Sequence, residues 1–212
     1  MKNQFDTIIF DWSGTISDDR IPVYESNKRL LKRYGVNLPE FKEWLFSTNG
    51  SIISYFDSVG VIEEKEKIFS SYKIAYSEVV KEGLAPTSYQ DAFSVLEKLR
   101  NKNKLLTIVS SHPQINLEEE VINYEMGQFF KIIKGNAIDK SSDITQIIER
   151  TQSSLDRVIY IGDMVQDINA ASKAGISCAV VTTGYHSRER LESANPPLGV
   201  FNNLTELSKI LI

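Results

Sequence analysis

Cysteine, histidine and long apolar runs are scarce in this 212-residue sequence. The single cysteine, Cys178, excludes an intramolecular disulfide and argues against a cysteine-based zinc site. No apolar run reaches the roughly 18 residues that a membrane-spanning helix requires, so we expect no membrane partner. The formal net charge of −4 leaves no basic footprint for nucleic acid, so we expect no nucleic-acid partner either.

We also expect no targeting segment. Residues 1–4 lead directly into a strand pattern, without the apolar core of a signal peptide. We therefore predict a cytoplasmic protein. The sequence does contain an ordinary globular composition, with 42% hydrophobic and 25% charged residues, and its length suits one α/β core with a small inserted domain.

Residues 5–10 predict a buried strand, and a helical texture follows it. From about residue 21 to residue 83, apolar residues recur at helical spacing, and proline or glycine marks the ends of the predicted helices. No convincing strand interrupts this stretch. We therefore predict a helical domain of residues 17–84, inserted after the first strand.

The pattern changes at about residue 85, where predicted helices begin to alternate with short apolar strands. The strands include residues 105–109, 157–161 and 177–182. Alternation of this kind predicts a parallel sheet that is covered by helices on both faces. The predicted fold is thus a doubly wound, Rossmann-like α/β core, formed by residues 1–16 and 85–212.

Polar side chains end several of these strands. Asp11 ends the first strand, Ser110 follows residues 105–109, and Asp163 follows residues 157–161. The carboxyl ends of parallel strands share one edge of the sheet, where α/β proteins bind their ligands. Asp167 comes one helical turn after Asp163, so the carboxylates are expected to converge. Carboxylates without a basic cluster favour Mg²⁺, which prefers oxygen ligands.

These segments carry a family resemblance. In their order and spacing they resemble the motifs of the haloacid dehalogenase-like (HAD) hydrolase superfamily, near its phosphoglycolate phosphatase and phosphonatase branch. The inserted helical domain resembles the cap of that family. The four matching segments are Phe10-Asp11-Trp12-Ser13-Gly14-Thr15, Ile108-Val109-Ser110, the lysine Lys140, and Ile161-Gly162-Asp163 with Asp167.

The resemblance implies a role for each of these residues. Asp11 would attack phosphorus and form an aspartyl-phosphate, which is covalent catalysis by a carboxylate. Lys140 would restrain Asp11 and neutralise developing charge. Ser110 and Ser111, with backbone N–H groups nearby, would hold phosphate oxygens. The Mg²⁺ ligands would be Asp11, the backbone carbonyl of Ser13 and Asp163, with Asp167 binding directly or through water.

Ser13 departs from the family pattern. Phosphatases of this family usually carry a second Asp at this position, which protonates the leaving oxygen and then activates water. A serine hydroxyl has no accessible pKa for either task, and general acid–base catalysis is typically worth about 10²–10⁴ in rate. The resemblance therefore implies a phosphohydrolase that is slow on small phosphorylated metabolites.

Three interpretations of Ser13 are open. In the first, the substrate has a leaving group that needs no proton, as in an acyl phosphate. In the second, the protein is a weakened enzyme that binds phosphate and Mg²⁺ for regulation. The third is a phosphonoacetaldehyde hydrolase-like enzyme, which has a small residue here and forms a Schiff base on a cap lysine. Lys140 in the third motif argues for the phosphatases. The Asp163 and Asp167 pair argues against dehalogenases, which need no Mg²⁺.

Four further polar residues lie near the motifs. His112, beside Pro113, is predicted to be a turn residue rather than a catalyst, and His186 is predicted to be an exposed loop residue. Asp18 and Asp19 are predicted at the hinge to the cap, where either could replace the missing acid. The expected partner is a small phosphorylated substrate, and the expected state is a monomer or a homodimer.

Overall fold

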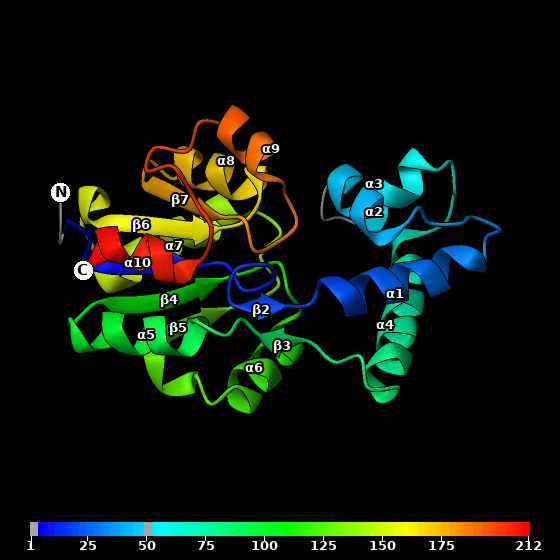
Figure 1. The fold of residues 1–212 in the computed structure, drawn as a ribbon, viewed down its shortest axis with the longest axis horizontal. Helices are drawn as coiled ribbons and strands as arrows, with labels where there is room; N and C mark the ends of the chain where they lie inside the picture. Colours follow the sequence, from blue (N-terminus) through cyan, green and yellow to red (C-terminus); the bar gives the residue numbers. More distant parts are fainter. Residues whose placement is uncertain (1–3, 49–51) are drawn as a thin grey trace. The chain divides into compact units, whose positions relative to one another are not determined.

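The computed structural model describes residues 4–48 and 52–212. It confirms the predicted fold class, a Rossmann-like α/β core that accompanies a helical unit (Figure 1). The chain divides into two compact units, one ending at Asp18 and resuming at Ser88, the other comprising Asp19–Thr87. Within the described part of the chain, no helix is long and apolar enough to cross a membrane.

The core is a six-stranded sheet with the order β5-β4-β1-β6-β7-β8, and all of its strand pairs are parallel. Short apolar runs form these strands because both faces of a parallel sheet are buried. The strands are β1 (Thr7–Phe10), β4 (Leu105–Val109), β5 (Phe130–Lys134), β6 (Val158–Gly162), β7 (Ser177–Val181) and β8 (Val200–Phe201).

The strand order reverses between β1 and β6. From β1 the chain proceeds outward through β4 and β5, and it then returns to the other side of β1 to lay down β6, β7 and β8. Phe10 of β1 pairs with Ile108 of β4 and with Ile161 of β6, so these three strands end together. Such a switch point at the carboxyl edge is where open α/β sheets bind their ligands.

Helices cover both faces of the sheet. Ile8 and Phe10 of β1 pack into a core with α5, α6 and α10, whereas Ile9 packs into the opposite core with α7, α8 and α9. Alternate residues of a strand point to opposite faces, so one short strand anchors both cores. The helices are α5 (Ala92–Asn101), α6 (Gln114–Asn123), α7 (Lys140–Thr151), α8 (Val165–Lys173), α9 (Arg188–Ser193) and α10 (Leu204–Leu211).

The unit Asp19–Thr87 has a core of its own, centred on Leu30, Leu31, Phe56 and Ile68. The sequence assigns residues 17–84 to this helical domain, a range close to that of the compact unit. Its helices are α1 (Arg20–Lys32), α2 (Phe41–Ser47), α3 (Ile52–Ser58) and α4 (Lys65–Lys81).

Some short elements were not predicted from the sequence. Two-residue strands, β2 (Ser17–Asp18) and β3 (Thr87–Ser88), form a small sheet where the chain passes between the units. Helix α9 and the 3₁₀ turns η1 (Gly127–Phe129) and η2 (Leu155–Arg157) are also additions. These elements span at most six residues, which is too short for hydrophobic periodicity to reveal them.

Candidate active site

Asp11 stands directly after β1, at the switch point of the sheet. Its backbone N–H donates to the carbonyl of Ile161 at 2.8 Å, which continues the β1–β6 ladder by one residue. Its side chain is buried, and one carboxylate oxygen accepts a hydrogen bond from the N–H of Trp12 at 2.7 Å. The strand and the turn that follows it therefore hold the carboxylate in one orientation.

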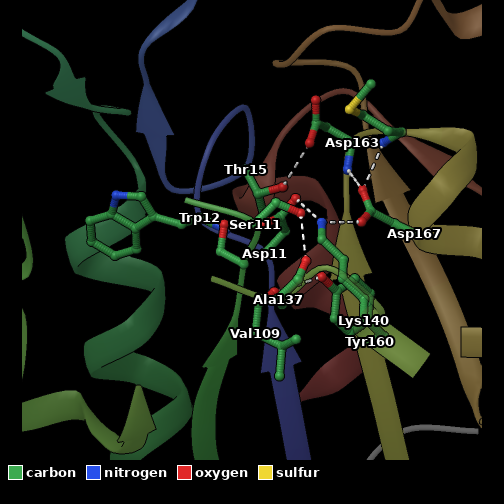
Figure 2. Close-up of polar contacts among 12 residues, drawn as sticks. Asp11, Trp12, Thr15, Val109, Ser111, Ala137, Lys140, Tyr160, Asp163 and Asp167 are labelled. Atoms are coloured by element: carbon green, nitrogen blue, oxygen red, sulfur yellow. Dashed lines mark hydrogen bonds and ion pairs between the residues drawn. The ribbon is translucent and has the colours of Figure 1, made fainter. Parts of the chain in front are cut away.

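Asp163 and Asp167 converge on Asp11, as the sequence predicts. One carboxylate oxygen from each of the three residues lies within 4.8 Å of the others, and all three residues are buried (Figure 2). Asp163 follows β6, and Asp167 lies in the first turn of α8. The second oxygen of Asp167 accepts from the N–H groups of Asp163 at 3.1 Å and Met164 at 3.0 Å. Asp167 thus also satisfies N–H groups where α8 begins.

Lys140 joins two of the three carboxylates. Its Nζ lies 2.7 Å from Asp11 Oδ2 and 2.7 Å from Asp167 Oδ1 (Figure 2). The residue opens α7, where the side chain of Asp139 caps the helix by accepting from the N–H of Ser141. Burial alone would lower the pKa of Lys140, but the adjacent carboxylates raise it well above the ordinary value. The neighbouring carboxylates therefore favour the charged form of Lys140.

The site holds more negative than positive charge. Burial raises the pKa of Asp11 although Lys140 opposes it, and burial together with repulsion from Asp167 and Asp11 raises the pKa of Asp163 strongly. Three carboxylates and one ammonium leave a formal charge of −2 in a buried place. A divalent cation with a preference for oxygen ligands matches both this charge and this donor set. The arrangement thus fits Mg²⁺.

Glycines make room for these carboxylates. A β-carbon on Gly14 or on Gly184 would overlap the Asp163 carboxylate, and one on Gly162 would overlap Asp167. Gly14 also has a φ of +75°, which favours glycine. The backbone can approach the acids closely only because these side chains are absent.

The loop after β7 contributes groups that the sequence analysis did not identify. The N–H of Tyr185 donates to Asp163 Oδ2 at 2.7 Å, and the hydroxyl of Thr183 donates to the carbonyl of Gly14 at 2.8 Å. On the first-motif loop, Thr15 Oγ1 lies 3.4 Å from Asp163 Oδ1. The sequence could have indicated these groups, because residues 183–185 follow a predicted strand whose carboxyl end lies at the same edge of the sheet as Asp11.

The two predicted phosphate-binding serines differ in their surroundings. Ser110 is buried beside Asp11, and its hydroxyl is among the groups that lower the pKa of that carboxyl. Its Oγ also accepts from the N–H of His112 at 3.3 Å. The hydroxyl of Ser111 instead donates to the carbonyl of Ala137 at 3.0 Å, holding the loop before α7 (Figure 2). Phosphate binding by either serine stays a prediction.

Ser13 lies in the turn after Asp11, half-buried, and its Oγ faces His112. Metal binding by its carbonyl stays a prediction. Asp18 ends β2, and Asp19 is buried directly before α1. A proton-carrying role for either acid also stays a prediction.

The prediction for His186 is wrong. Its side chain is buried rather than exposed, and its Nδ1 accepts from the N–H of Val165 at 3.0 Å. An N–H group in the first turn of a helix has no partner within the helix, and the imidazole provides one for α8. The position of His186 next to Tyr185 brings it to that helix end.

Comparison with known proteins agrees with this geometry. The model of the family described as haloacid dehalogenase-like hydrolase matches residues 8–181. The chain belongs to this family. The match includes Asp11, Lys140, Asp163 and Asp167, and it confirms the resemblance on which the sequence interpretation rests. The protein is accordingly a hydrolase.

Among curated relatives, a 5'-nucleotidase from Pseudomonas aeruginosa is 22% identical, and the alignment covers 91% of this chain and 90% of the relative. Phosphoglycolate phosphatase 1 from the same organism is also 22% identical, with 94% and 77% covered. A solved haloacid dehalogenase-like family hydrolase from Streptococcus pneumoniae superposes with a TM-score of 0.80 at 22% identity. It covers 96% of this chain and 97% of its own, which supports the fold.

Proposed function

We propose that the protein is a Mg²⁺-dependent phosphohydrolase that acts on a small phosphorylated metabolite through an aspartyl-phosphate on Asp11. The observation that carries the proposal is the cluster at the switch point. There, Asp11 and Asp167 both contact Lys140 at 2.7 Å, and Asp163 completes a set of oxygen donors. The names of the two curated relatives also favour a phosphate ester over a C–P bond as the bond that is cleaved.

In the first step, a carboxylate oxygen of Asp11 attacks phosphorus, and the bond from phosphorus to the leaving oxygen breaks. In the second step, water attacks the same phosphorus, and the bond to Asp11 breaks to release inorganic phosphate. Lys140 fixes the Asp11 carboxylate and supplies positive charge, so the chemistry consists mostly of positioning and electrostatics.

Asp11, Asp163 and Asp167 are the residues that would hold Mg²⁺. When bound, the ion would neutralise phosphoryl oxygens and the surplus negative charge of the site. The helical unit Asp19–Thr87 would serve as the cap that selects the substrate, in the manner of a domain that closes over a site.

Ser13 sets the expected rate. A serine hydroxyl neither holds a proton for an alkoxide leaving group nor accepts one from water at neutral pH. The loss of general acid–base help is worth about 10²–10⁴ in rate. We therefore propose slow turnover of ordinary esters and better turnover of acyl phosphates, whose carboxylate leaving group needs no proton.

The test is an assay of p-nitrophenyl phosphate and acetyl phosphate with Mg²⁺, using the native protein, Asp11→Asn and Ser13→Asp. The native protein should favour acetyl phosphate, Ser13→Asp should gain activity on the ester, and Asp11→Asn should lose both. Asp156→Asn, which changes an exposed carboxylate in η2, is the matched control and should behave as the native protein. If neither the native protein nor Ser13→Asp releases phosphate from either substrate, the proposal is wrong and the regulatory alternative gains support.

A further inference from the structure

Trp12 connects the nucleophile to the body of the core. Its N–H donates to Asp11 Oδ1 at 2.7 Å, and Lys140 contacts the other oxygen of that carboxylate at 2.7 Å. The carbonyl of Trp12 accepts from the N–H groups of Ile16 at 2.8 Å and Ser17 at 3.0 Å, which closes the turn of the first motif. The position of the Trp12 backbone therefore sets the orientation of the Asp11 carboxylate.

The indole of Trp12 points away from the acids of the site (Figure 2). It is fully buried, and a buried indole N–H needs an acceptor. That acceptor is Oε2 of Glu120 on α6, at 2.6 Å. Tyr124, which directly follows α6, stacks its ring on the indole, with the ring centroids 5.6 Å apart and the planes at 14°. Two side chains from this end of α6 thus hold the indole, one at its N–H and the other at its face.

Glu120 also binds the far end of the same loop. Its Oε2 accepts from the hydroxyl of Ser17 at 2.9 Å, and Ser17 Oγ lies 2.9 Å from the hydroxyl of Tyr124. Ser17 opens β2, where the chain leaves the core unit. A single carboxylate oxygen therefore joins the residue that follows the nucleophile to the residue at which the loop ends.

A carboxylate is a costly acceptor for a purely structural purpose. Glu120 is buried, and burying a charge is unfavourable unless the charge is paired and hydrogen-bonded. A neutral acceptor could satisfy the same donors with a smaller loss of solvation. Hydrogen bonds to an ionised acceptor are roughly twice as strong as neutral ones, so a carboxylate holds the loop more firmly. Its other oxygen lies 3.0 Å from Nε2 of His112 and so faces a polar group as well.

We propose that Glu120 is a positioning residue for the nucleophile and that it acts through Trp12. The proposal rests on the proposed phosphohydrolase function. Glu120 fixes the indole, the fixed indole holds the Trp12 backbone, and the Trp12 N–H orients the Asp11 carboxylate. Attack on phosphorus requires aligned reacting atoms, and a misplacement of about 1 Å can cost about 10²-fold in rate. A loop released from Glu120 should therefore slow the formation of the aspartyl-phosphate.

The test measures how fast acetyl phosphate phosphorylates Asp11 in single-turnover quench experiments with Mg²⁺. Glu120→Leu keeps a side chain of similar size and removes the acceptor. Its rate at saturating substrate should fall about 10- to 100-fold, while the half-saturating concentration and the affinity for inorganic phosphate stay within a few-fold of the native values. Glu120→Gln keeps a neutral acceptor and should lie between Glu120→Leu and the native protein. Glu119→Gln changes an exposed acid of the same helix and is the matched control.

A purely structural role for Glu120 is the alternative, and two outcomes would show it. In the first, Glu120→Leu lowers Tm, but each folded molecule is phosphorylated at the native rate. In the second, the affinity for inorganic phosphate falls as much as the rate does, which means that the whole site is distorted. Either outcome overturns the positioning role and leaves the phosphohydrolase function standing.

A double-mutant cycle tests the route through Trp12. Trp12→Phe keeps an aromatic ring against Tyr124 and removes the N–H that Glu120 binds, so it should slow phosphorylation by itself. Adding Glu120→Leu to Trp12→Phe should cost far less than it costs in the native background, because residues that act through one contact are not additive. Fully additive losses would overturn the route. If Glu120→Leu does not fold, Trp12→Phe decides alone: a native rate would overturn the proposal, and a slow rate with native phosphate affinity would support it.

A readout without metal or substrate completes the test. In EDTA, the indole N–H proton of Trp12 is identified by NMR as the resonance that Trp12→Phe removes. A hydrogen bond to a carboxylate moves a proton resonance downfield, so Glu120→Leu should shift this resonance upfield and Glu119→Gln should leave it in place. An unshifted resonance in Glu120→Leu would refute the contact on which the positioning depends. If neither the native protein nor Ser13→Asp forms a phosphoenzyme, the proposed function fails and the positioning role fails with it.

Discussion

Lys140 is the residue whose removal tests the electrostatics of the site most directly. Replacing it by Met keeps much of the volume and removes the positive charge that contacts Asp11 and Asp167 at 2.7 Å. At an effective dielectric constant of about 20, each of these contacts is worth about 6 kcal/mol of gross attraction. Two such contacts give about 12 kcal/mol before any desolvation is subtracted.

The repulsion that Lys140 offsets has a similar size. Oxygens of the three carboxylates lie within 4.8 Å of one another, so each pair of charges repels by at least about 3.5 kcal/mol at the same dielectric constant. Without the ammonium this repulsion is unopposed. Relaxation and proton uptake reduce the net effect, and breaking a buried ion pair typically costs about 3–5 kcal/mol. We expect a loss of this size in the free energy of unfolding.

The pH dependence has a definite sign. The pKa values of Asp11 and Asp163 are raised in the folded protein, so both carboxyls take up protons on folding. Groups of this kind favour the folded state at low pH, and that contribution is lost as the pH rises from the unfolded-state pKa towards the folded-state pKa. The deficit of Lys140→Met should therefore be largest near pH 8 and shrink towards pH 5.

The assay is urea unfolding at pH 8 and pH 5 with EDTA, followed by titration with Mg²⁺ at pH 8. Lys134→Met is the control, because Lys134 pairs with Asp143 at 3.4 Å while half-exposed and should cost less than about 1 kcal/mol. Mg²⁺ should restore part of the stability of Lys140→Met. If Lys140→Met unfolds at the same urea concentration as the native protein at pH 8, Lys140 does not offset the repulsion among the three carboxylates, and this reasoning is refuted.

Three further predictions concern the same core. Asp163→Asn should lose the stabilisation by Mg²⁺ yet be at least as stable as the native protein in EDTA at pH 8, because one of three repelling charges is gone; a retained Mg²⁺-dependent shift in Tm would remove Asp163 from the site. Gly184→Ala should lose about 1–3 kcal/mol in urea unfolding, because its β-carbon would overlap Asp163, and an unchanged midpoint would contradict this packing. Cys178 is buried and its thiol pKa is raised, so iodoacetamide should label it only in denaturant, and rapid labelling of the folded protein would exclude the described burial.

The sequence alone predicted the core fold and the first members of the site. Short apolar runs can be recognised locally in the sequence. Where such runs alternate with predicted helices, they predict a parallel sheet that is covered by helices. Asp11 and Asp163 each follow such a run, so their meeting at one edge follows from the parallel arrangement itself. The strand β4 begins and ends at the predicted residues, Leu105 and Val109.

Glu120 shows where local reasoning stopped. It follows Glu118 and Glu119, and three consecutive acids suggest a solvated surface. Helix α6 begins at Gln114 and buries Glu120 together with Leu117 and Val121. Glu120 lies three residues after Leu117, and Val121 lies four residues after it, and this spacing was a usable signal. A buried carboxylate needs hydrogen-bond donors, and those of Glu120 come from other segments, which the sequence of the helix does not reveal.

The tertiary structure decided which groups meet. The contact of Ser13 with His112 and the contact of Tyr185 with Asp163 join segments that are far apart in the chain. Whether a polar residue is buried depends on the donors and acceptors that other segments bring to it, and no local periodicity encodes them. The sequence therefore determined that a carboxylate ends β1 in a hydrolase of this family. The folded chain determined that the serine two residues later faces a histidine held by a buried acid.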